Sequence, residues 1–409
     1  MSPLRLIPPA PTKRIAIRVI PAAERALREG HPWLFAQSIR RQSHDGRAGD
    51  LAVIFDRKDR FLAVGLYDPE SPIRVRILQH QHPAAINQSW FQARLAAAAS
   101  LRASLPATQT TGYRLVHGEN DGLPGLVIDR YHQTYVTKLY TAAWAPHLQD
   151  VVAALTAVAA PERILLRLSR AVAEQRVNLH GLREGTMLYG PPVEGPVRFA
   201  ENSLYFGADV LRGQKTGFFL DQRENRARVE RLAQDQSVLN LFAYTGGFSL
   251  YAARGGAASV TSVDISRPAL DAAVRNFALN PALSHVPHKL IQGDVFEVLT
   301  SLQGNRVWFD LVIIDPPSFA KQQAEVERAS AAYARLVRAG LGVLRPGGTL
   351  VMASCSSQVS ATSFFALVLE TAMKMGRPLQ EIERTAHPVD HPIGFKEGAY
   401  LKCLFAVAP

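Results

Sequence analysis

Cysteine is scarce in this sequence, which has only Cys355 and Cys403 among its 409 residues. Two cysteines are too few for the disulfide framework of a small secreted protein, so we expect a reducing, cytoplasmic environment. The sequence also has no run of about 18 or more apolar residues, which excludes a transmembrane helix. Residues 1–12 lack the continuous apolar core and the small-residue cleavage site of a secretory signal. We therefore expect no membrane partner.

Acidic residues are also outnumbered. The chain has 35 Asp and Glu against 46 Lys and Arg, a formal net charge of +11. This balance favours a polyanionic partner, because basic side chains that neutralise phosphates release condensed counterions. An ordinary basic protein has the same charge, so only an independent motif can decide. The length predicts two or three domains, and the 47% hydrophobic fraction indicates a folded chain.

The first region, residues 13–85, has the patterns of a small β domain. Two apolar runs, 50–55 and 61–67, flank a polar turn and predict a hairpin. Apolar and basic side chains then alternate in residues 73–77, which places Arg74 and Arg76 on one strand face. That face is either simply solvated or in contact with phosphate, and both interpretations stay open.

The next region, residues 86–196, predicts a connecting helix and a compact α+β domain. Apolar residues at helical spacing predict the helix over 88–105. Farther along, the patterns predict strands over 134–141 and 164–169 and a helix over 148–159. A hairpin that begins at residue 197 then leads into the last region, 197–409.

From about Ser237, short apolar strands alternate with amphipathic helices. One helix begins after Ser266 as its N-cap, and a longer one covers 324–344 and stops at Arg345-Pro346-Gly347-Gly348. Such alternation implies a mostly parallel sheet covered on both faces, a Rossmann-like α/β fold. The expected strands are 238–242, 260–263, 289–292, 311–314 and 349–353.

The unusual residues of this region follow the strands, where ligands bind in an open α/β sheet. The first strand leads to Tyr244-Thr245-Gly246-Gly247-Phe248, whose paired glycines let the backbone approach a ligand closely. The second ends at Asp264, where a carboxylate can accept both ribose hydroxyls, and the third at Asp294, beside an adenine amino group. Each acid alone is more often an N-cap or a loop residue. Together, in this order, they favour a nucleoside-binding site.

The fourth strand ends in Asp315-Pro316-Pro317-Ser318-Phe319. Because proline restricts the residue before it, the acid is held in a rigid, extended turn. This geometry suits a hydrogen bond to a flat base. The alternative is a turn that only ends the strand.

The fifth strand leads to Cys355, whereas Cys403 lies inside an apolar C-terminal strand. A cysteine in an apolar strand is normally core packing, and we assign Cys403 to that role. Cys355 is expected at the same sheet edge as Asp315, where a thiolate can add to carbon 6 of a pyrimidine and make carbon 5 nucleophilic. Core packing is the alternative for Cys355 too.

Several motifs together resemble the bacterial 23S ribosomal RNA cytosine-C5 methyltransferase family. The resemblance covers nearly the whole chain and is specific in combination. Its motifs are Gly30-His31-Pro32-Trp33-Leu34-Phe35, residues 122–131, residues 213–226, Tyr244-Thr245-Gly246-Gly247-Phe248, Asp315-Pro316-Pro317-Ser318-Phe319 and the Cys355 segment.

The resemblance implies a PUA-like RNA-binding domain (13–85), a central α+β domain (86–196) and a class I methyltransferase domain (197–409). It implies S-adenosylmethionine as cofactor, with Asp264 at the ribose and Asp294 near the adenine, 23S ribosomal RNA as partner, and Cys355 as nucleophile. Asp221 and Arg223 match a segment that passes the cofactor. No metal site is expected. The predicted catalytic residues are Cys355 and Asp315, and the predicted cofactor contacts are Asp221, Arg223, Phe242, Tyr244, Thr245, Gly246, Asp264, Ser266, Asp294, Val295, Asp315 and Pro316.

Two departures from broader patterns bear on the chemistry. Asn240 stands where many class I methyltransferases have an acid, and Ser318 stands where many RNA cytosine-C5 enzymes have a second cysteine. A two-cysteine mechanism is therefore excluded, and another base must remove the carbon-5 proton. A methyltransferase acting on a guanine or adenine nitrogen is the nearest alternative, and a non-catalytic RNA-binding assembly factor is the other. The sequence does not distinguish a monomer from a homodimer.

Overall fold

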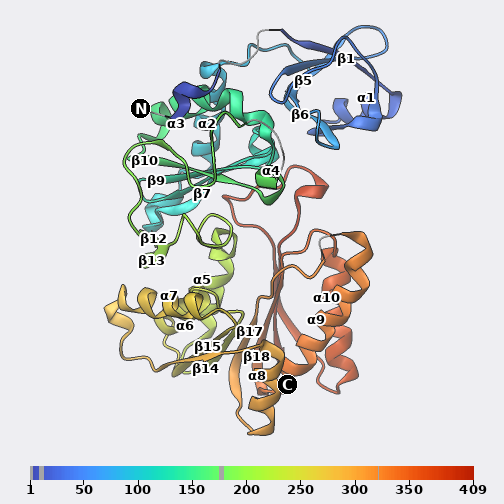
Figure 1. Ribbon diagram of the computed structural model, residues 1–409. Coiled ribbons are helices and arrows are strands. Elements are labelled where there is room, and N and C mark those ends of the chain that lie inside the picture. Colours follow the sequence, from blue (N-terminus) through green and yellow to red (C-terminus); the bar gives the residue numbers. More distant parts are fainter. Residues whose placement is uncertain (1–2, 9–12, 175–178, 321) are drawn as a thin grey trace. The chain divides into compact units, whose positions relative to one another are not determined.

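The computed structural model describes residues 3–8, 13–174, 179–320 and 322–409. The chain forms two compact units, which Figure 1 shows as ribbons. The first unit comprises Met1–Ala200, Ala208–Phe218 and Val389–Phe395, and the second comprises Glu201–Gly207, Phe219–Pro388 and Lys396–Pro409. The chain therefore returns twice to the first unit after leaving it. Among the described residues, none of the helices has the length and apolar content to span a membrane.

The N-terminal part of the first unit is a six-stranded sheet with one helix, α1 (Pro21–Arg28). The predicted hairpin is confirmed, because β4 (Leu51–Phe55) and β5 (Phe61–Tyr67) pair antiparallel. Ile15, Ile17 and Ile54 are fully buried in its core. The sheet order is β2 (Trp33–Phe35), β6 (Ile73–His80), β5 (Phe61–Tyr67), β4 (Leu51–Phe55), β1 (Ile15–Val19) and β3 (Ile39–Gln42).

Arg76 does not lie on a solvated strand face, which was one of the two interpretations that the alternating pattern left open, whereas a phosphate contact of Arg74 stays a prediction. Arg76 is buried, with 8% of its surface exposed, and its guanidinium pairs with Glu119 at 3.0 Å. Arg74 donates to the backbone oxygen of Pro69 and lies over the ring of Tyr67. The pattern was misleading because period-two alternation shows which side chains share a face but not what later packs on that face.

The central part of the first unit is a five-stranded sheet. One face packs against α2 (Gln88–Leu101) and α3 (Leu148–Ala159), in a core that includes Leu95, Trp144 and Ile164. Asn87 caps α2 by accepting from the backbone of Trp90, which explains why the helix begins there. A short helix, α4 (Arg170–Glu174), follows β10. The sheet order is β11 (Met187–Tyr189), β10 (Arg163–Leu168), β9 (Thr134–Leu139), β8 (Leu126–Tyr131) and β7 (Gly112–His117).

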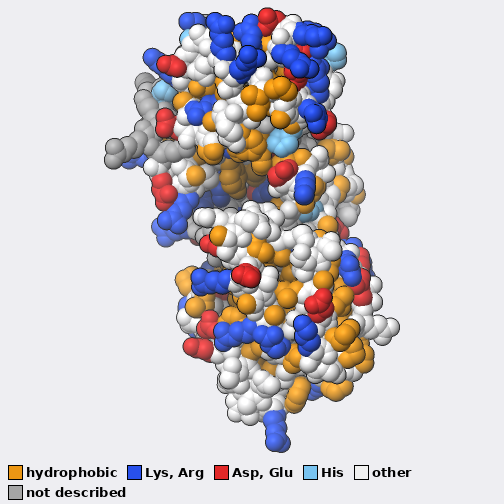
Figure 2. All heavy atoms as spheres, turned by 90° about the vertical axis from the view of Figure 1, so that its right-hand side faces the viewer, with side chains coloured by type: hydrophobic (Ala, Val, Ile, Leu, Met, Phe, Trp, Pro, Cys, Tyr) orange, Lys and Arg blue, Asp and Glu red, His pale blue; other side chains and the backbone are white. Residues whose placement is uncertain are grey.

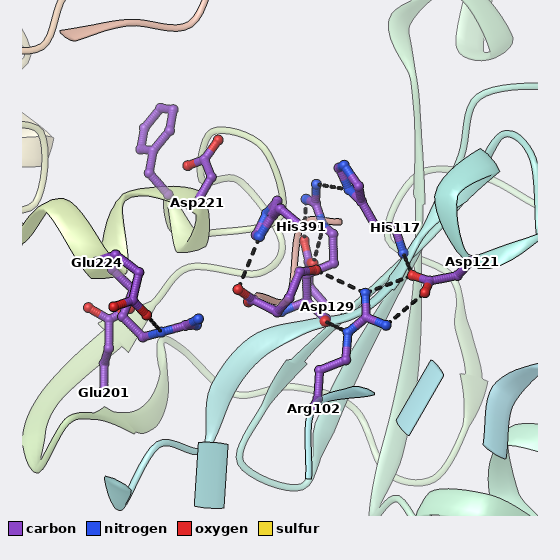
Figure 3. A network of polar contacts seen from close by, with 12 residues as sticks. Arg102, His117, Asp121, Asp129, Glu201, Asp221, Glu224 and His391 are labelled. Carbon is purple, nitrogen blue, oxygen red and sulfur yellow. Dashed lines mark hydrogen bonds and ion pairs between the residues drawn. The ribbon is translucent and has the colours of Figure 1, made fainter. Parts of the chain in front are cut away.

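The two returning segments are held in the first unit by polar contacts. Arg102 forms a two-pronged ion pair with Asp121, at 2.7 Å for each bond, and also donates to the backbone oxygen of Asp390 (Figure 3). In the other segment, Thr216 donates to Asp129 at 2.6 Å. Because a buried guanidinium without partners is costly, these complete pairings fix where the segments lie.

The second unit is built on a seven-stranded sheet in which only β20 runs antiparallel to its neighbours. Its order is β16 (His288–Gln292), β15 (Ser259–Asp264), β14 (Ser237–Leu241), β17 (Phe309–Ile314), β18 (Leu344–Ser354), β20 (Lys402–Ala408) and β19 (Gln380–Thr385). A two-stranded ribbon, β12 (Val197–Glu201) and β13 (Leu204–Ala208), precedes it in the chain. The strands β14 to β18 all end at one edge, which we call the carboxyl edge.

Helices cover both faces of this sheet (Figure 1). One layer holds α5 (Arg223–Leu232), α6 (Gly247–Arg254) and α7 (Arg267–Ala278), and the other holds α8 (Val295–Gly304), α9 (Val326–Leu341) and α10 (Ala361–Lys374). Ser266 caps α7, as the sequence predicts. The predicted stop of the long helix differs in detail, because residues 345–348 already belong to β18. The Rossmann-like architecture is confirmed.

Candidate active site

The loop after β14 has an unusual backbone. Phe242 and Tyr244 have positive φ angles, 58° and 48°, which are uncommon for residues with side chains. Gly246 has φ 78°, and a Cβ atom there would lie 2.9 Å from the Cβ of Ala273 on α7. The loop is therefore pressed against α7, and Gly246 is the residue that permits the approach.

Asp264, at the end of β15, stabilises the loop after β14 through hydrogen bonds. One carboxylate oxygen accepts from the backbone N–H of Tyr244 and the other from that of Ser266, each at 2.8 Å. A carboxylate has about four acceptor positions, so both oxygens keep capacity for the hydroxyls of a ribose. The predicted residues Tyr244, Asp264 and Ser266 thus lie together.

A chain of polar side chains runs beneath the loop. Asn240 donates to Ser249, which bonds Ser262, which in turn bonds His288. Two buried atoms here, Oδ1 of Asn240 and Oγ1 of Thr245, have no hydrogen-bond partner among the described residues. Because buried polar atoms are normally paired, these two fit a loop whose remaining partners come from a ligand such as the cofactor.

Asp294 has a structural role as the N-cap of α8. It caps α8 by accepting from the backbone N–H groups of Phe296 and Glu297, and it is exposed. Its neighbour Val295 is buried in the sheet core. The capping interpretation, which the sequence favoured for any single acid, is therefore correct for Asp294. The proximity to adenine stays a prediction.

Asp221 lies in the turn just before α5, Arg223 is the first residue of α5, and both are buried. Asp221 accepts a hydrogen bond from the hydroxyl of Tyr400 at 2.8 Å, and Arg223 pairs with Glu224 at 3.2 Å. The contact with Tyr400 joins the α5 segment to the residues just before β20. Sequence reasoning missed Tyr400.

Two loops meet at the carboxyl edge beyond β17 and β18. The thiol of Cys355 lies 3.9 Å from the backbone oxygen of Pro316. The hydroxyls of Ser318 and Ser356 both donate to the backbone oxygen of Ala320, each at 3.0 Å. The predicted pair, Asp315 and Cys355, is thereby brought to neighbouring loops that are tied to each other.

Tyr333 closes this part of the site from α9. Its hydroxyl bonds Ser354 at 2.8 Å, and burial raises its pKa to about 12, with the nearby Cys355 and Asp315 charges acting in the same direction. Tyr333 therefore stays neutral in the working range of pH. Its hydrogen bond to Ser354 stabilises the end of β18.

The chain matches two family signatures. Residues 119–406 match the S-adenosylmethionine-dependent methyltransferases, and residues 17–80 match a PUA-like domain. By fold, a structure from Streptococcus mutans described as a SAM-dependent methyltransferase superposes with a TM-score of 0.82 at 23% identity, covering 96% of this chain and 100% of that one. A further methyltransferase, solved in complex with SAH, has the same TM-score and identity and covers 97% of this chain and 100% of its own.

The fold, the carboxyl-edge loops and these matches define a class I S-adenosylmethionine-dependent methyltransferase with a PUA-like domain at its N-terminus. A Deinococcus radiodurans protein, "Ribosomal RNA large subunit methyltransferase", is 50% identical over 403 residues, which is 97% of this chain and 98% of the relative. A Pseudoalteromonas translucida protein, "Ribosomal RNA large subunit methyltransferase I", is 37% identical over 93% of this chain and 96% of its own. The chain belongs to this family of large-subunit ribosomal RNA methyltransferases.

Proposed function

We propose that this enzyme forms 5-methylcytosine in 23S ribosomal RNA, with Cys355 as the nucleophile. The observation that carries the proposal is the place of Cys355, a half-buried thiol at the carboxyl edge beside the Asp315-Pro316 loop. The names of the relatives support ribosomal RNA of the large subunit as the substrate. Ribosomal RNA and free thiols are both found in the cytoplasm, where we expect the enzyme to act.

Carbon 5 of cytosine is a poor nucleophile, and this dictates the first step. The Cys355 thiolate adds to carbon 6, and the electron pair of the carbon 5–carbon 6 double bond moves onto carbon 5 and toward nitrogen 3, which makes carbon 5 electron-rich. Asp315 is placed to bond nitrogen 3 or the amino group of the ring and stabilise the altered base. S-adenosylmethionine, when bound, supplies an electrophilic methyl group.

Release requires loss of the carbon-5 proton and departure of the thiolate from carbon 6. Ser318 stands where a second cysteine serves other RNA cytosine-C5 enzymes, so a different base takes the proton. In the proposed site, the cofactor is held by the loop after β14, by the acids at the ends of β15 and β16, by the loop after β17 and by the start of α5. The residues are Asp221, Arg223, Phe242, Tyr244, Thr245, Gly246, Asp264, Ser266, Asp294, Val295, Asp315 and Pro316.

The PUA-like domain is the proposed RNA-holding part. Lys and Arg side chains gather over the part of the face in Figure 2 that belongs to the six-stranded sheet. Exposed cations there include Arg40 and Arg41 on β3. Such side chains suit phosphate contacts, which position RNA without reading its sequence.

The proposal is tested by mapping methylated nucleotides in ribosomal RNA from cells with and without the gene. We expect one 5-methylcytosine in 23S RNA that disappears with the gene and returns with the wild-type enzyme. Loss of a methyl group from a guanine or adenine nitrogen would replace this proposal with the nitrogen reaction. No change in methylation would favour an assembly factor.

A further inference from the structure

A lysine lies at the start of the apolar strand β20. Lys402 is only 4% exposed. Its strand partner on β18 is Ser354, the residue before Cys355. A buried ammonium group is costly unless its donors are satisfied, so its contacts have to account for its presence.

The Lys402 ammonium group donates hydrogen bonds to three backbone oxygens. These are the oxygens of Ser356, of Val359 at 2.7 Å and of Tyr400 at 3.0 Å. Only the protonated amine has three donors, so the geometry is that of a charged lysine. Ser356 and Val359 belong to the turn that follows Cys355, and the lysine therefore ties down the segment that carries the thiol.

The charge also lies within electrostatic reach of Cys355. Burial lowers the pKa of Lys402 to about 8, and the interaction with Cys355 acts in the opposite direction. Because such coupling is mutual, the ammonium group favours the thiolate form of Cys355. Tyr333 also interacts with Cys355 and stays neutral, whereas Asp315, the residue before Pro316, carries a negative charge that disfavours a nearby thiolate.

We propose that Lys402 is a positioning residue for Cys355, which fixes the turn after the thiol and holds a positive charge that offsets Asp315. This inference rests on the proposed role of Cys355 as the nucleophile. It also assigns a structural role to the short segment before β20, which contains Tyr400. Tyr400 binds Lys402 through its backbone and Asp221 through its hydroxyl, so one segment connects the nucleophile loop to the predicted cofactor side.

The test measures the ionisation of Cys355 directly. In a Cys403→Ala background, Cys355 is the only thiol, and its rate of alkylation by iodoacetamide is followed against pH. Lys402→Met should move the midpoint of this profile upward by at least one pH unit, because the positive charge is lost. Lys402→Arg should keep the midpoint close to that of the parent protein, because the guanidinium stays charged.

Ser356→Ala is the matched control. It removes the hydroxyl that bonds Ala320 in the same turn but changes no charge, so the midpoint should stay in place. An unmoved midpoint in Lys402→Met, or an equal shift in Ser356→Ala, would overturn the proposal.

If Lys402→Met does not fold, the arginine variant decides through the methyl-transfer rate. The wild-type rate should fall above about pH 8, because Lys402 then loses a proton and one of the hydrogen bonds that fix the turn, whereas Lys402→Arg should keep its rate at pH 9. The same alkaline loss in both proteins would contradict a role for the lysine charge. Alkylation reports on the thiol whatever base is methylated, and turnover of Cys355→Ala reports on the proposed function separately.

Discussion

Cys403 lies on β20, and Cys355 lies just beyond the end of the adjacent antiparallel strand β18 in different surroundings. Cys403 is inside β20, pairs with Ala353 across the sheet and is fully buried, and burial raises the pKa of its thiol well above the usual value. Cys355 follows the last residue of β18, is partly exposed and has a buried ammonium group nearby. A difference of a few residues therefore separates a buried thiol from a partly exposed one, and the partly exposed thiol is the one to which we assign the proposed chemistry.

The largest expected effect comes from exchanging each cysteine for alanine. Cys355→Ala should abolish methyl transfer, by about a thousandfold or more, because nothing else can add to carbon 6. Cofactor and RNA binding should stay nearly unchanged. Cys403→Ala should keep its rate and lose only about 1 kcal/mol of stability from the small cavity. Single-turnover rates and thermal unfolding of both variants check this prediction. A Cys355→Ala enzyme that methylates at near the wild-type rate would show that the two cysteines do not differ in their role in the reaction.

A second comparison sets an acid at the carboxyl edge against one at the opposite edge of the same sheet. Asp264→Ala should weaken S-adenosylmethionine binding at least about tenfold, since hydrogen bonds to a charged acceptor contribute roughly 1.5–3 kcal/mol each. Asp310 bonds Ser237 and Arg345 at the amino ends of the strands, so Asp310→Ala should leave the affinity in place. Calorimetry distinguishes them, and equal affinities for the two variants would remove Asp264 from the site.

A third prediction concerns the polar chain beneath the β14 loop. Burial lowers the pKa of His288 to about 4. Between about pH 6.5 and pH 4, this imidazole is therefore protonated in the unfolded chain but neutral in the folded protein. Stability should therefore fall between pH 6.5 and pH 4, by at most roughly 3 kcal/mol from this group. His288→Gln should reduce that slope, whereas the exposed His285→Gln should not. Urea unfolding at several pH values measures it, and identical slopes in all three proteins would contradict the assignment.

The smallest effect is expected at the PUA-like domain. Arg40→Ala with Arg41→Ala should reduce the log–log slope of RNA affinity against salt by roughly one unit for each lost phosphate contact. Arg328 and Lys374, exposed cations on α9 and α10, provide the control pair. RNA affinity that does not depend on salt, or equal slopes for both double variants, would show that β3 is not the RNA-holding surface.

The sequence predicts the fold and the positions of the strand ends well, and it predicts the packing around them poorly. Alternation of strands and helices was enough for the Rossmann-like fold, and strand ends located Asp264, Asp315 and Cys355, because parallel strands share one edge. Arg76 was misjudged, since its partner Glu119 lies 43 residues away and no periodicity reports it. Lys402 was passed over although it is a cation within an apolar run. The lysine in an apolar run was visible in the sequence. Its role could not be inferred from the sequence because only the pairing of β20 with β18 places Lys402 beside the Cys355 turn.

The central claim is that Cys355 attacks carbon 6 of a cytosine, and a trapping experiment tests it most directly. Ribosomal RNA carrying 5-fluorocytosine has fluorine where the carbon-5 proton must leave, so the covalent complex cannot resolve. With S-adenosylmethionine present, the wild-type enzyme should form a denaturant-resistant complex with this RNA, and mass spectrometry should place the link on Cys355. Cys355→Ala should form none. Absence of any complex with the wild-type enzyme, together with continued methylation of unmodified RNA, would contradict the account.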